Sequence, residues 1–161
     1  MVEVRRTTGG QWQELRQVRL QALTDSPRAF ASTLAREQAF DEAEWRRRAD
    51  GTCWLAWDDE RVVGTAGLVP DDVSPSALQL VGMWVAPAVR GNGAAAALVE
   101  AACAFARTAG VPEVCLWVAD GNERARRSYA RWGFVATGER QPLPGDPART
   151  EDRMRRLLDR S

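Results

Sequence analysis

The sequence predicts an α/β protein in which about four helices pack on a mixed central sheet of about six to seven strands. Apolar runs of strand length alternate with amphipathic stretches, and the order strand, helix, strand over residues 78–118 indicates a parallel crossover between two buried strands. The length of 161 residues is that of one domain, and no repeat or linker divides it. We therefore expect a single domain over residues 1–161.

The first half of the chain predicts two helices and a hairpin after a short strand. Apolar residues recur at helical spacing from Trp12 to Ala22, and Pro27 stops that pattern. Asp41 followed by Glu44 is typical of a helix start, whereas residues 28–37 are ambiguous. The expected elements are a strand over 2–6, a helix over 11–23, a helix over 41–49, and a β-hairpin made of 53–57 and 61–69.

The second half predicts two helices among four strands. One helix has an apolar face from Ala94 to Phe105 and closes with Gly110 and Pro112, in the order expected past a helix end. A loop rich in proline and glycine, 142–147, precedes the last strand. The expected elements are strands over 78–85, 114–118, 133–138 and 152–158, and helices over 93–108 and 123–131.

The composition excludes several classes of chemistry. All 22 basic residues are arginine, and the chain has neither lysine nor histidine. A Ser-His-Asp triad, a P-loop lysine, a Schiff-base lysine and a histidine metal site are therefore impossible within one chain, and we expect no metal. The isolated cysteines Cys53, Cys103 and Cys115 lie in apolar contexts and are expected to be reduced and buried.

The net charge and the N-terminal sequence limit the partners and the cellular compartment that we expect. The formal net charge of zero gives no general attraction to nucleic acid or to anionic lipid, so we expect neither as a partner. The N-terminal sequence lacks the apolar stretch of a secretory signal, and no apolar run approaches the roughly 20 residues that span a bilayer. We expect a cytoplasmic protein that is a monomer or a homodimer.

Two segments suggest a chemistry. The glycine loop from Arg90 to Ala95 leads into a helix, and the free N–H groups at a helix start, with the positive end of its dipole, can hold a phosphate. In the second segment Asn122 and Tyr129, the only tyrosine, stand about two turns apart on one helix, with the small Ala125 between them. Together they indicate group transfer from a phosphate-bearing carrier.

These segments resemble a known family. The stretch from Met83 to Ala95 resembles the acyl-CoA binding motif of the GCN5-related N-acetyltransferase (GNAT) family, and the stretch from Asn122 to Phe134 resembles the family's next motif. About 55 consecutive residues match in order and spacing. The resemblance implies a GNAT-like fold with a splayed parallel strand pair. It also implies direct transfer of an acetyl group from acetyl-CoA to a primary amine in a ternary complex.

The resemblance also implies roles for single residues. The backbone of residues 83–85 would bond the pantetheine arm, with the Val85 N–H facing the thioester oxygen, where negative charge develops. Tyr129 would protonate the departing thiolate, and Asn122 would bond the pantetheine, with a helix N-cap as its structural alternative. The implied coenzyme A contacts are Met83, Trp84, Val85, Arg90, Gly91, Asn92, Gly93, Ala94, Ala95, Asn122, Ala125 and Tyr129.

The acceptor side of the site is less defined. Many family members carry a glutamate on the strand before the loop, whereas residues 78–84 contain no acid. A water held by backbone carbonyls is one alternative base, and Glu37, Asp71 and Asp72 are distant candidates.

A weaker resemblance, over residues 23–33, implies that Phe30 and Thr33 contact the acceptor. The acceptor itself stays open among a small amine, a peptide N-terminus and a protein lysine.

Two other functions stay open. Gly91, Gly93 and Ala96 also fit the dinucleotide fingerprint, with Asp120 placed where an acid would bind ribose. Two features oppose a dinucleotide-binding fold. Residues 86–90 separate the glycine loop from its strand, and too few strand-helix units follow to build the required sheet. The other alternative is a non-catalytic acyl-CoA-binding sensor or scaffold with the same fold.

Overall fold

The structure, a computed structural model, describes residues 1–159. Its seven-stranded mixed sheet has the order β1-β2-β3-β4-β5-β7-β6. The strands are β1 (Val2–Arg6), β2 (Cys53–Asp58), β3 (Arg61–Pro70), β4 (Ala77–Val85), β5 (Glu113–Ala119), β6 (Val135–Leu143) and β7 (Asp146–Leu157). The α-helices are α1 (Trp12–Asp25), α2 (Leu34–Gln38), α3 (Glu42–Ala49), α4 (Ala94–Thr108) and α5 (Glu123–Arg131). The α/β class with a mixed sheet and four longer helices is therefore confirmed.

The observed elements differ from those expected in three places. Helix α1 continues to Asp25, because the Ser26 N–H still bonds the Ala22 carbonyl, and it ends just before Pro27. The ambiguous stretch forms a 3-10 turn, Pro27–Ala29, followed by α2. Strands β6 and β7 reach into the expected 142–147 loop, and Pro142 is tolerated because β6 is an edge strand.

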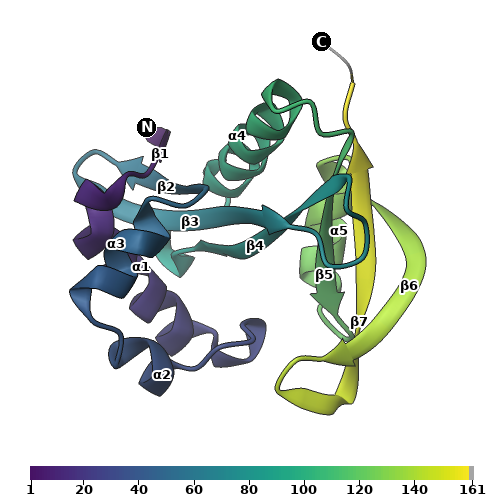
Figure 1. The fold of residues 1–161 in the computed structure, drawn as a ribbon, viewed down its shortest axis with the longest axis horizontal. Helices are drawn as coiled ribbons and strands as arrows, with labels where there is room; N and C mark the ends of the chain where they lie inside the picture. The colour runs from purple at the N-terminus through teal and green to yellow at the C-terminus, as the bar shows by residue number, and fades with distance from the viewer. Residues whose placement is uncertain (160–161) are drawn as a thin grey trace. The chain divides into compact units, whose positions relative to one another are not determined.

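The chain forms two compact units, which can be followed in Figure 1. Unit 1 comprises residues 1–68 and 81–102, and unit 2 comprises residues 69–80 and the chain from Cys103 onward.

Unit 1 contains the antiparallel strands β1, β2 and β3 with helices α1, α2 and α3 (Figure 1). Val18 of α1 and Trp45 of α3 are buried with Leu55 and Val63 of the β2–β3 hairpin. The hairpin turns at Asp59, which adopts a left-handed conformation with φ 55°. The acidic turn expected between two apolar segments is thus present, and burial of their apolar side chains stabilises the hairpin.

Unit 2 is built around β5. Strand β5 pairs in parallel with the start of β4, where the ladder ends at Gln79 and Cys115 among the described residues. On its other edge it pairs antiparallel with β7 from Glu113 to Ala119, and β6 pairs with β7. Helix α5 runs along one face of β5 and β7 (Figure 1).

The two faces of β7 differ. Neighbouring side chains of a strand point to opposite faces. Asp152 forms an ion pair with Arg126 of α5, so Asp152 lies on the α5 face. Glu151 and Arg153, on either side of it, therefore lie on the face opposite α5.

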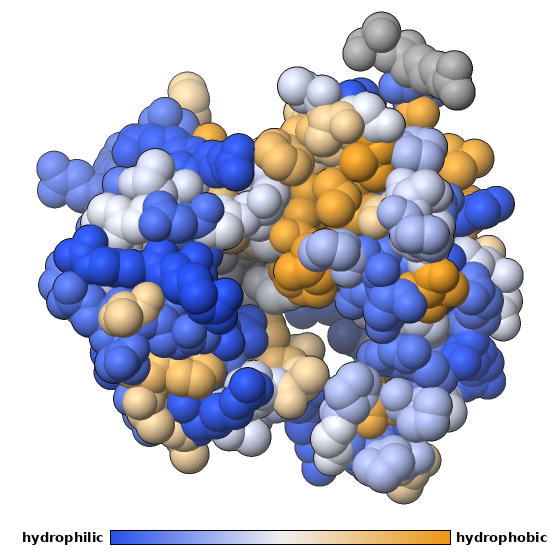
Figure 2. Space-filling model, viewed as in Figure 1, coloured by the Kyte–Doolittle hydropathy of each residue, from blue (hydrophilic) through white to orange (hydrophobic). Residues whose placement is uncertain are grey.

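Apolar surface is unevenly distributed between the units. The face shown in Figure 2 is largely hydrophilic, with apolar surface gathered in patches. Of the large apolar side chains that are exposed, all but Met1 belong to unit 2 within residues 1–159, namely Val69, Val73, Val135 and Leu157.

Candidate functional site

The glycine loop of unit 1 connects β4 to α4 through a 3-10 turn, Pro87–Val89. Gly91 and Gly93 have φ angles of 90° and 91°, which glycine alone adopts at little cost. A Cβ atom at either position would meet no atom within 4 Å, so the backbone angle, and not close packing, requires glycine. The Ala94 N–H donates to Asn92 Oδ1 at 3.2 Å. The loop therefore presents backbone N–H groups at the start of α4 beside open space.

Arg90 does not extend freely from this loop. Its Nε donates to the Val85 carbonyl at 3.0 Å, and its guanidinium bonds Asp25 at 3.2 Å. Trp84 Nε1 donates to the same Asp25 oxygen at 3.0 Å. Hydrogen bonds from Ser26 and Trp84, with the charge of Arg90, lower the pKa of Asp25. Arg90 thus ties the loop to the end of α1.

Sequence reasoning missed Asp25. Its only signal was its position within the segment 23–33 that resembles the family.

The end of β4 carries the three residues expected along the pantetheine arm. Trp84 and Val85 are buried and Met83 is half-buried. Gly82, just before them, has φ +63°, so the regular strand geometry is interrupted at this position. A left-handed glycine within a strand is typical of a β-bulge.

Helix α5 of unit 2 begins at the expected asparagine. Asn122 Oδ1 accepts from the Ala125 N–H at 3.2 Å, which makes Asn122 the N-cap. Its NH₂ group is not used by this cap. Tyr129 lies farther along the same helix and packs edge-on against Trp132 and Phe134, with ring centroids 5.8 and 5.7 Å away.

The Tyr129 hydroxyl is neutral at physiological pH. Burial raises the pKa of Tyr129 to about 12. Within residues 1–159 the hydroxyl has no hydrogen-bond partner. The group is therefore a protonated donor that the protein itself leaves available.

The face of β7 opposite α5 carries a polar cluster. Arg153, which is 4% exposed, donates to Asp71 at 2.7 Å, to Glu139 at 3.0 Å and to Cys115 Sγ at 2.9 Å. Burial raises the pKa of the Cys115 thiol to about 12, so this cysteine is not a nucleophile at neutral pH. Glu151, on the same face, is buried and accepts from Gln141 Nε2 at 2.7 Å.

Sequence reasoning did not single out Glu151. An acid in a strand of alternating polarity gives no local signal of its burial.

Phe30 and Thr33, the expected acceptor contacts, both belong to unit 1 and have structural partners. The Arg19 guanidinium lies 4.6 Å from the Phe30 ring centroid. The Thr33 side chain caps α2 by accepting from the Arg36 N–H at 3.2 Å.

Glu37, a candidate base, is committed to an ion pair. Its carboxylate is 0% exposed and receives two hydrogen bonds from Arg19, at 2.8 and 3.1 Å. Burial alone would raise the pKa of Glu37, but the hydrogen bonds and charges of the arginines outweigh burial and lower it. Such a carboxylate is a weak base.

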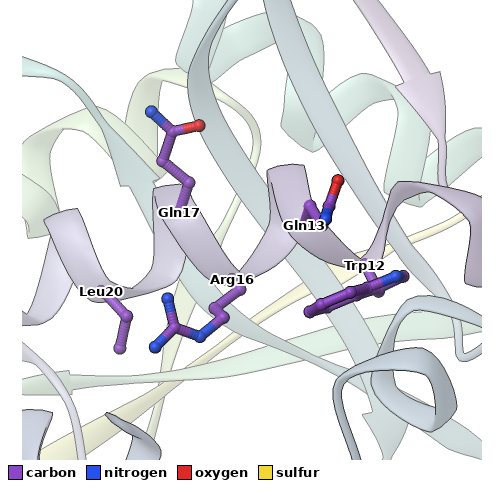
Figure 3. A pocket seen from close by; sticks show the side chains of 5 residues that line it. All are labelled: Trp12, Gln13, Arg16, Gln17 and Leu20. Atoms are coloured by element: carbon purple, nitrogen blue, oxygen red, sulfur yellow. The ribbon is translucent and has the colours of Figure 1, made fainter. Parts of the chain in front are cut away.

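A surface pocket lies along α1 in unit 1, lined by Trp12, Gln13, Arg16, Gln17 and Leu20 (Figure 3). All five side chains come from one helix. Trp12 and Arg16 point to one side of this helix, and Gln17 points to the other (Figure 3). None of the expected site residues lines this pocket, so we do not place the chemistry there.

Among the described residues 1–159, no three Cys, Asp or Glu side chains are grouped so that they could hold a metal ion. Over the same range no helix combines the length and apolarity needed to cross a membrane.

Comparison with known proteins identifies the family. The profile of the Acetyltransferase (GNAT) family matches residues 12–134, which is most of the chain. The chain therefore belongs to the GNAT family of acetyltransferases.

Human N-acetyltransferase 8B is 39% identical over 93 residues, covering 55% of this chain and 41% of the human protein. The chain spans about half the length of the curated relatives it matches.

Solved structures share the fold. An acetyltransferase of the GNAT family from Streptococcus pneumoniae has a TM-score of 0.80 at 17% identity, covering 99% of this chain and 100% of that one. yncA of Salmonella typhimurium, solved with its cofactor acetyl-CoA, has a TM-score of 0.75 at 16% identity, covering 99% and 95%. At these identities the likeness concerns the fold.

Proposed function

We propose that the protein transfers an acetyl group from acetyl-CoA to a primary amine, by direct attack within a ternary complex. The observation that carries the proposal is the loop from Arg90 to Ala95, where two left-handed glycines lead into α4 of a GNAT-family chain. The presence of acetyl-CoA as cofactor in the solved relative yncA supports the same co-substrate here.

The glycine loop holds the pyrophosphate of coenzyme A. The backbone N–H groups from Gly91 to Ala95 are the donors, and the dipole of the fifteen-residue helix α4 adds a positive field. The Ala94 N–H exchanges its contact with Asn92 Oδ1 for the ligand, and the Asn92 N–H exchanges its bond to the Val89 carbonyl. Arg90 keeps its bonds to Val85 and Asp25 and acts as a positioning residue for the loop.

We assign residues 83–85 and the residues Asn122 and Ala125 to the pantetheine arm, as the family resemblance implies. The backbone of residues 83–85 bonds the arm, and the Val85 N–H faces the thioester oxygen. Asn122 caps α5 through Oδ1 while its NH₂ group donates to the arm, and Ala125 leaves room beside it.

Tyr129 presents its hydroxyl to the sulfur. Its pKa of about 12 exceeds the ordinary value of a thiol, near 8.5, so the proton stays on the phenol. We therefore assign Tyr129 as a hydrogen-bond donor that stabilises the departing thiolate, a narrower role than complete protonation.

Phe30 and Thr33 contact the acceptor in this proposal, on the strength of the resemblance. Both side chains also have partners within unit 1, the Arg19 guanidinium for Phe30 and the Arg36 N–H for Thr33.

Calorimetric titration with acetyl-CoA, with NAD and NADP as controls, tests the proposed function. We expect saturable binding of acetyl-CoA alone. Binding of a dinucleotide, or no binding of acetyl-CoA, would reject it. Thiol release from acetyl-CoA in the presence of tyramine, spermidine, kanamycin or an alanyl peptide then separates an enzyme from a sensor, which would bind acetyl-CoA and release no thiol.

A further inference from the structure

Glu151 is a buried carboxylate without a cation. It is 7% exposed, and no arginine forms an ion pair with it within residues 1–159, although the chain has 22. Glu37 and Asp71, whose side chains are 0% exposed, each bond an arginine. The partner of Glu151 is the neutral Gln141. Burial of an uncompensated charge is costly, so Glu151 calls for a functional reason.

The same face of unit 2 carries unpartnered polar atoms. In the β5–β7 register Trp117 lies opposite Arg153, and Ala119 lies opposite Glu151, so all four share the face opposite α5. Trp117 Nε1, Arg153 Nε and Asp71 Oδ1 are buried without a hydrogen-bond partner. Buried polar atoms without partners are rare in native proteins. Three of the six such atoms found within residues 1–159 lie in this cluster around Arg153, which favours a polar ligand at this face.

Glu151 is also close in the fold to the start of α5. Its cross-strand partner Ala119 accepts, through its carbonyl, the N–H of Asn122 at 3.1 Å. Tyr129 lies on α5 and Glu151 lies on the opposite face of the sheet. We take this separation to divide the two roles, with the donor for the departing sulfur on one face and the acceptor for the amine proton on the other.

We propose that Glu151 takes the proton from the acceptor amine, an inference that rests on the proposed acetyl transfer. The ammonium proton passes to the Glu151 carboxylate, and the freed nitrogen lone pair attacks the thioester carbonyl carbon. The C–N bond forms and the C–S bond breaks, and the sulfur leaves as a thiolate that Tyr129 stabilises. The second nitrogen proton reaches the thiolate through water, and Glu151 returns its proton to water, so that one proton is released per acetyl group.

The electrostatics of Glu151 suit a base. Burial raises the pKa of Glu151, and the charge of Asp72 raises it further, while the hydrogen bond from Gln141 opposes them. Asp72 faces Glu151 from the β3–β4 connection, and Gln141 faces it from β6. A higher pKa makes a stronger base, closer to the amine that it must deprotonate.

The test compares Glu151→Gln with wild type and with Glu42→Gln, a control on α3 whose carboxylate is 57% exposed and paired with Arg46. Thiol release is measured with the four amines named above and with hydroxylamine. Hydroxylamine is uncharged at neutral pH and needs no base to free its lone pair. We expect E151Q to lower kcat/KM with the amines about a hundredfold or more. Hydroxylamine-dependent release should stay at the wild-type rate, and E42Q should match wild type throughout.

The pH profile separates a base from a structural residue. For wild type, kcat/KM with an amine should fall as pH drops through the raised pKa of Glu151. For E151Q that limb should disappear, and the rate should rise with pH as solvent deprotonates the amine. A profile unchanged by the substitution, or equal losses with amines and hydroxylamine, would overturn the assignment.

Stability gives a readout that needs no acceptor. Because its pKa is raised, native Glu151 binds its proton more tightly than the unfolded chain does, so its contribution to stability declines as pH rises through that pKa. E151Q should therefore raise Tm at neutral pH and lose this advantage under acid conditions. If E151Q instead lowered Tm at neutral pH, the claim that Glu151 carries an uncompensated buried charge would be contradicted.

The two proposals can fail separately. Wild type that binds no acetyl-CoA, or that binds it and acetylates no amine, refutes the acetyl transfer and Glu151's role with it. Wild type that acetylates an amine at a rate unaffected by E151Q refutes only the role of Glu151.

Discussion

Tyr129 shows how packing can fix the protonation state of a single side chain. Its ring is enclosed by Trp132 and Phe134, and its pKa of about 12 keeps the hydroxyl protonated at any pH used for an assay. Loss of this donor should affect the departure of the sulfur and leave the phosphate contacts of the loop intact.

The Tyr129→Phe variant should lower kcat about a hundredfold, the usual effect of removing one donor to a developing negative charge. The affinity for acetyl-CoA should change little, because the ring and its packing remain. Steady-state kinetics and calorimetry measure the two quantities. Trp132→Phe, which keeps an aromatic ring against Tyr129, serves as control, and an unchanged kcat for Tyr129→Phe would remove its assigned role.

At the scale of elements, the loop between β4 and α4 depends on backbone angles. Gly93 and Gly110 both have positive φ, 91° and 76°, and a Cβ at either would meet no atom within 4 Å. Gly93 precedes α4, whereas Gly110 follows it. Both glycines therefore need a left-handed backbone, but only Gly93 belongs to the proposed phosphate site.

Gly93→Ala and Gly110→Ala should each lower the free energy of unfolding by about 1–2 kcal/mol, the cost of a left-handed residue with a Cβ atom. Only Gly93→Ala should also weaken acetyl-CoA binding, because it disturbs the loop that presents the N–H groups. Urea unfolding and calorimetry give the two quantities. Equal loss of affinity in both variants would show that the effect comes from lost stability and not from the loop.

At the scale of the whole molecule, a ligand that binds only the folded chain must stabilise it. Acetyl-CoA at about 100 times its Kd should contribute about 2.7 kcal/mol. For a chain of 161 residues each kcal/mol shifts Tm by about 2–4 °C, so a rise of about 5–11 °C is expected in a thermal unfolding experiment. NAD at the same concentration should give no shift, and a similar shift with NAD would contradict the assignment of the loop.

Much of the fold could be predicted from local patterns. The apolar runs placed the strands around 53–69, 78–85 and 114–118, and helical periodicity placed α4 and α5 within a few residues. The family was recognisable because its two motifs are short and contiguous, and the match over residues 12–134 confirms it. Boundaries that depend on pairing, such as the end of β6, were wrong because an edge strand accepts a proline that local rules assign to a loop.

The roles of the individual site residues stay predictions, as does the single domain. For these the structure adds context: Asn122 caps α5, and Arg90 bonds Val85 and Asp25. The cap leaves only the NH₂ group of Asn122 for a ligand, and the two bonds of Arg90 make it a residue that positions the loop.

The sequence by itself determined the fold class, the family and the motif residues from Met83 to Ala95 and from Asn122 to Tyr129, because these depend on residues close together in the chain. Only the tertiary structure decided which acids are neutralised. Asp71 pairs with an arginine 82 residues away and Asp25 with one 65 residues away, whereas Glu151 has a neutral partner. With 22 acids and 22 arginines no local pattern can assign such pairs, because each depends on which strands and helices the fold brings side by side.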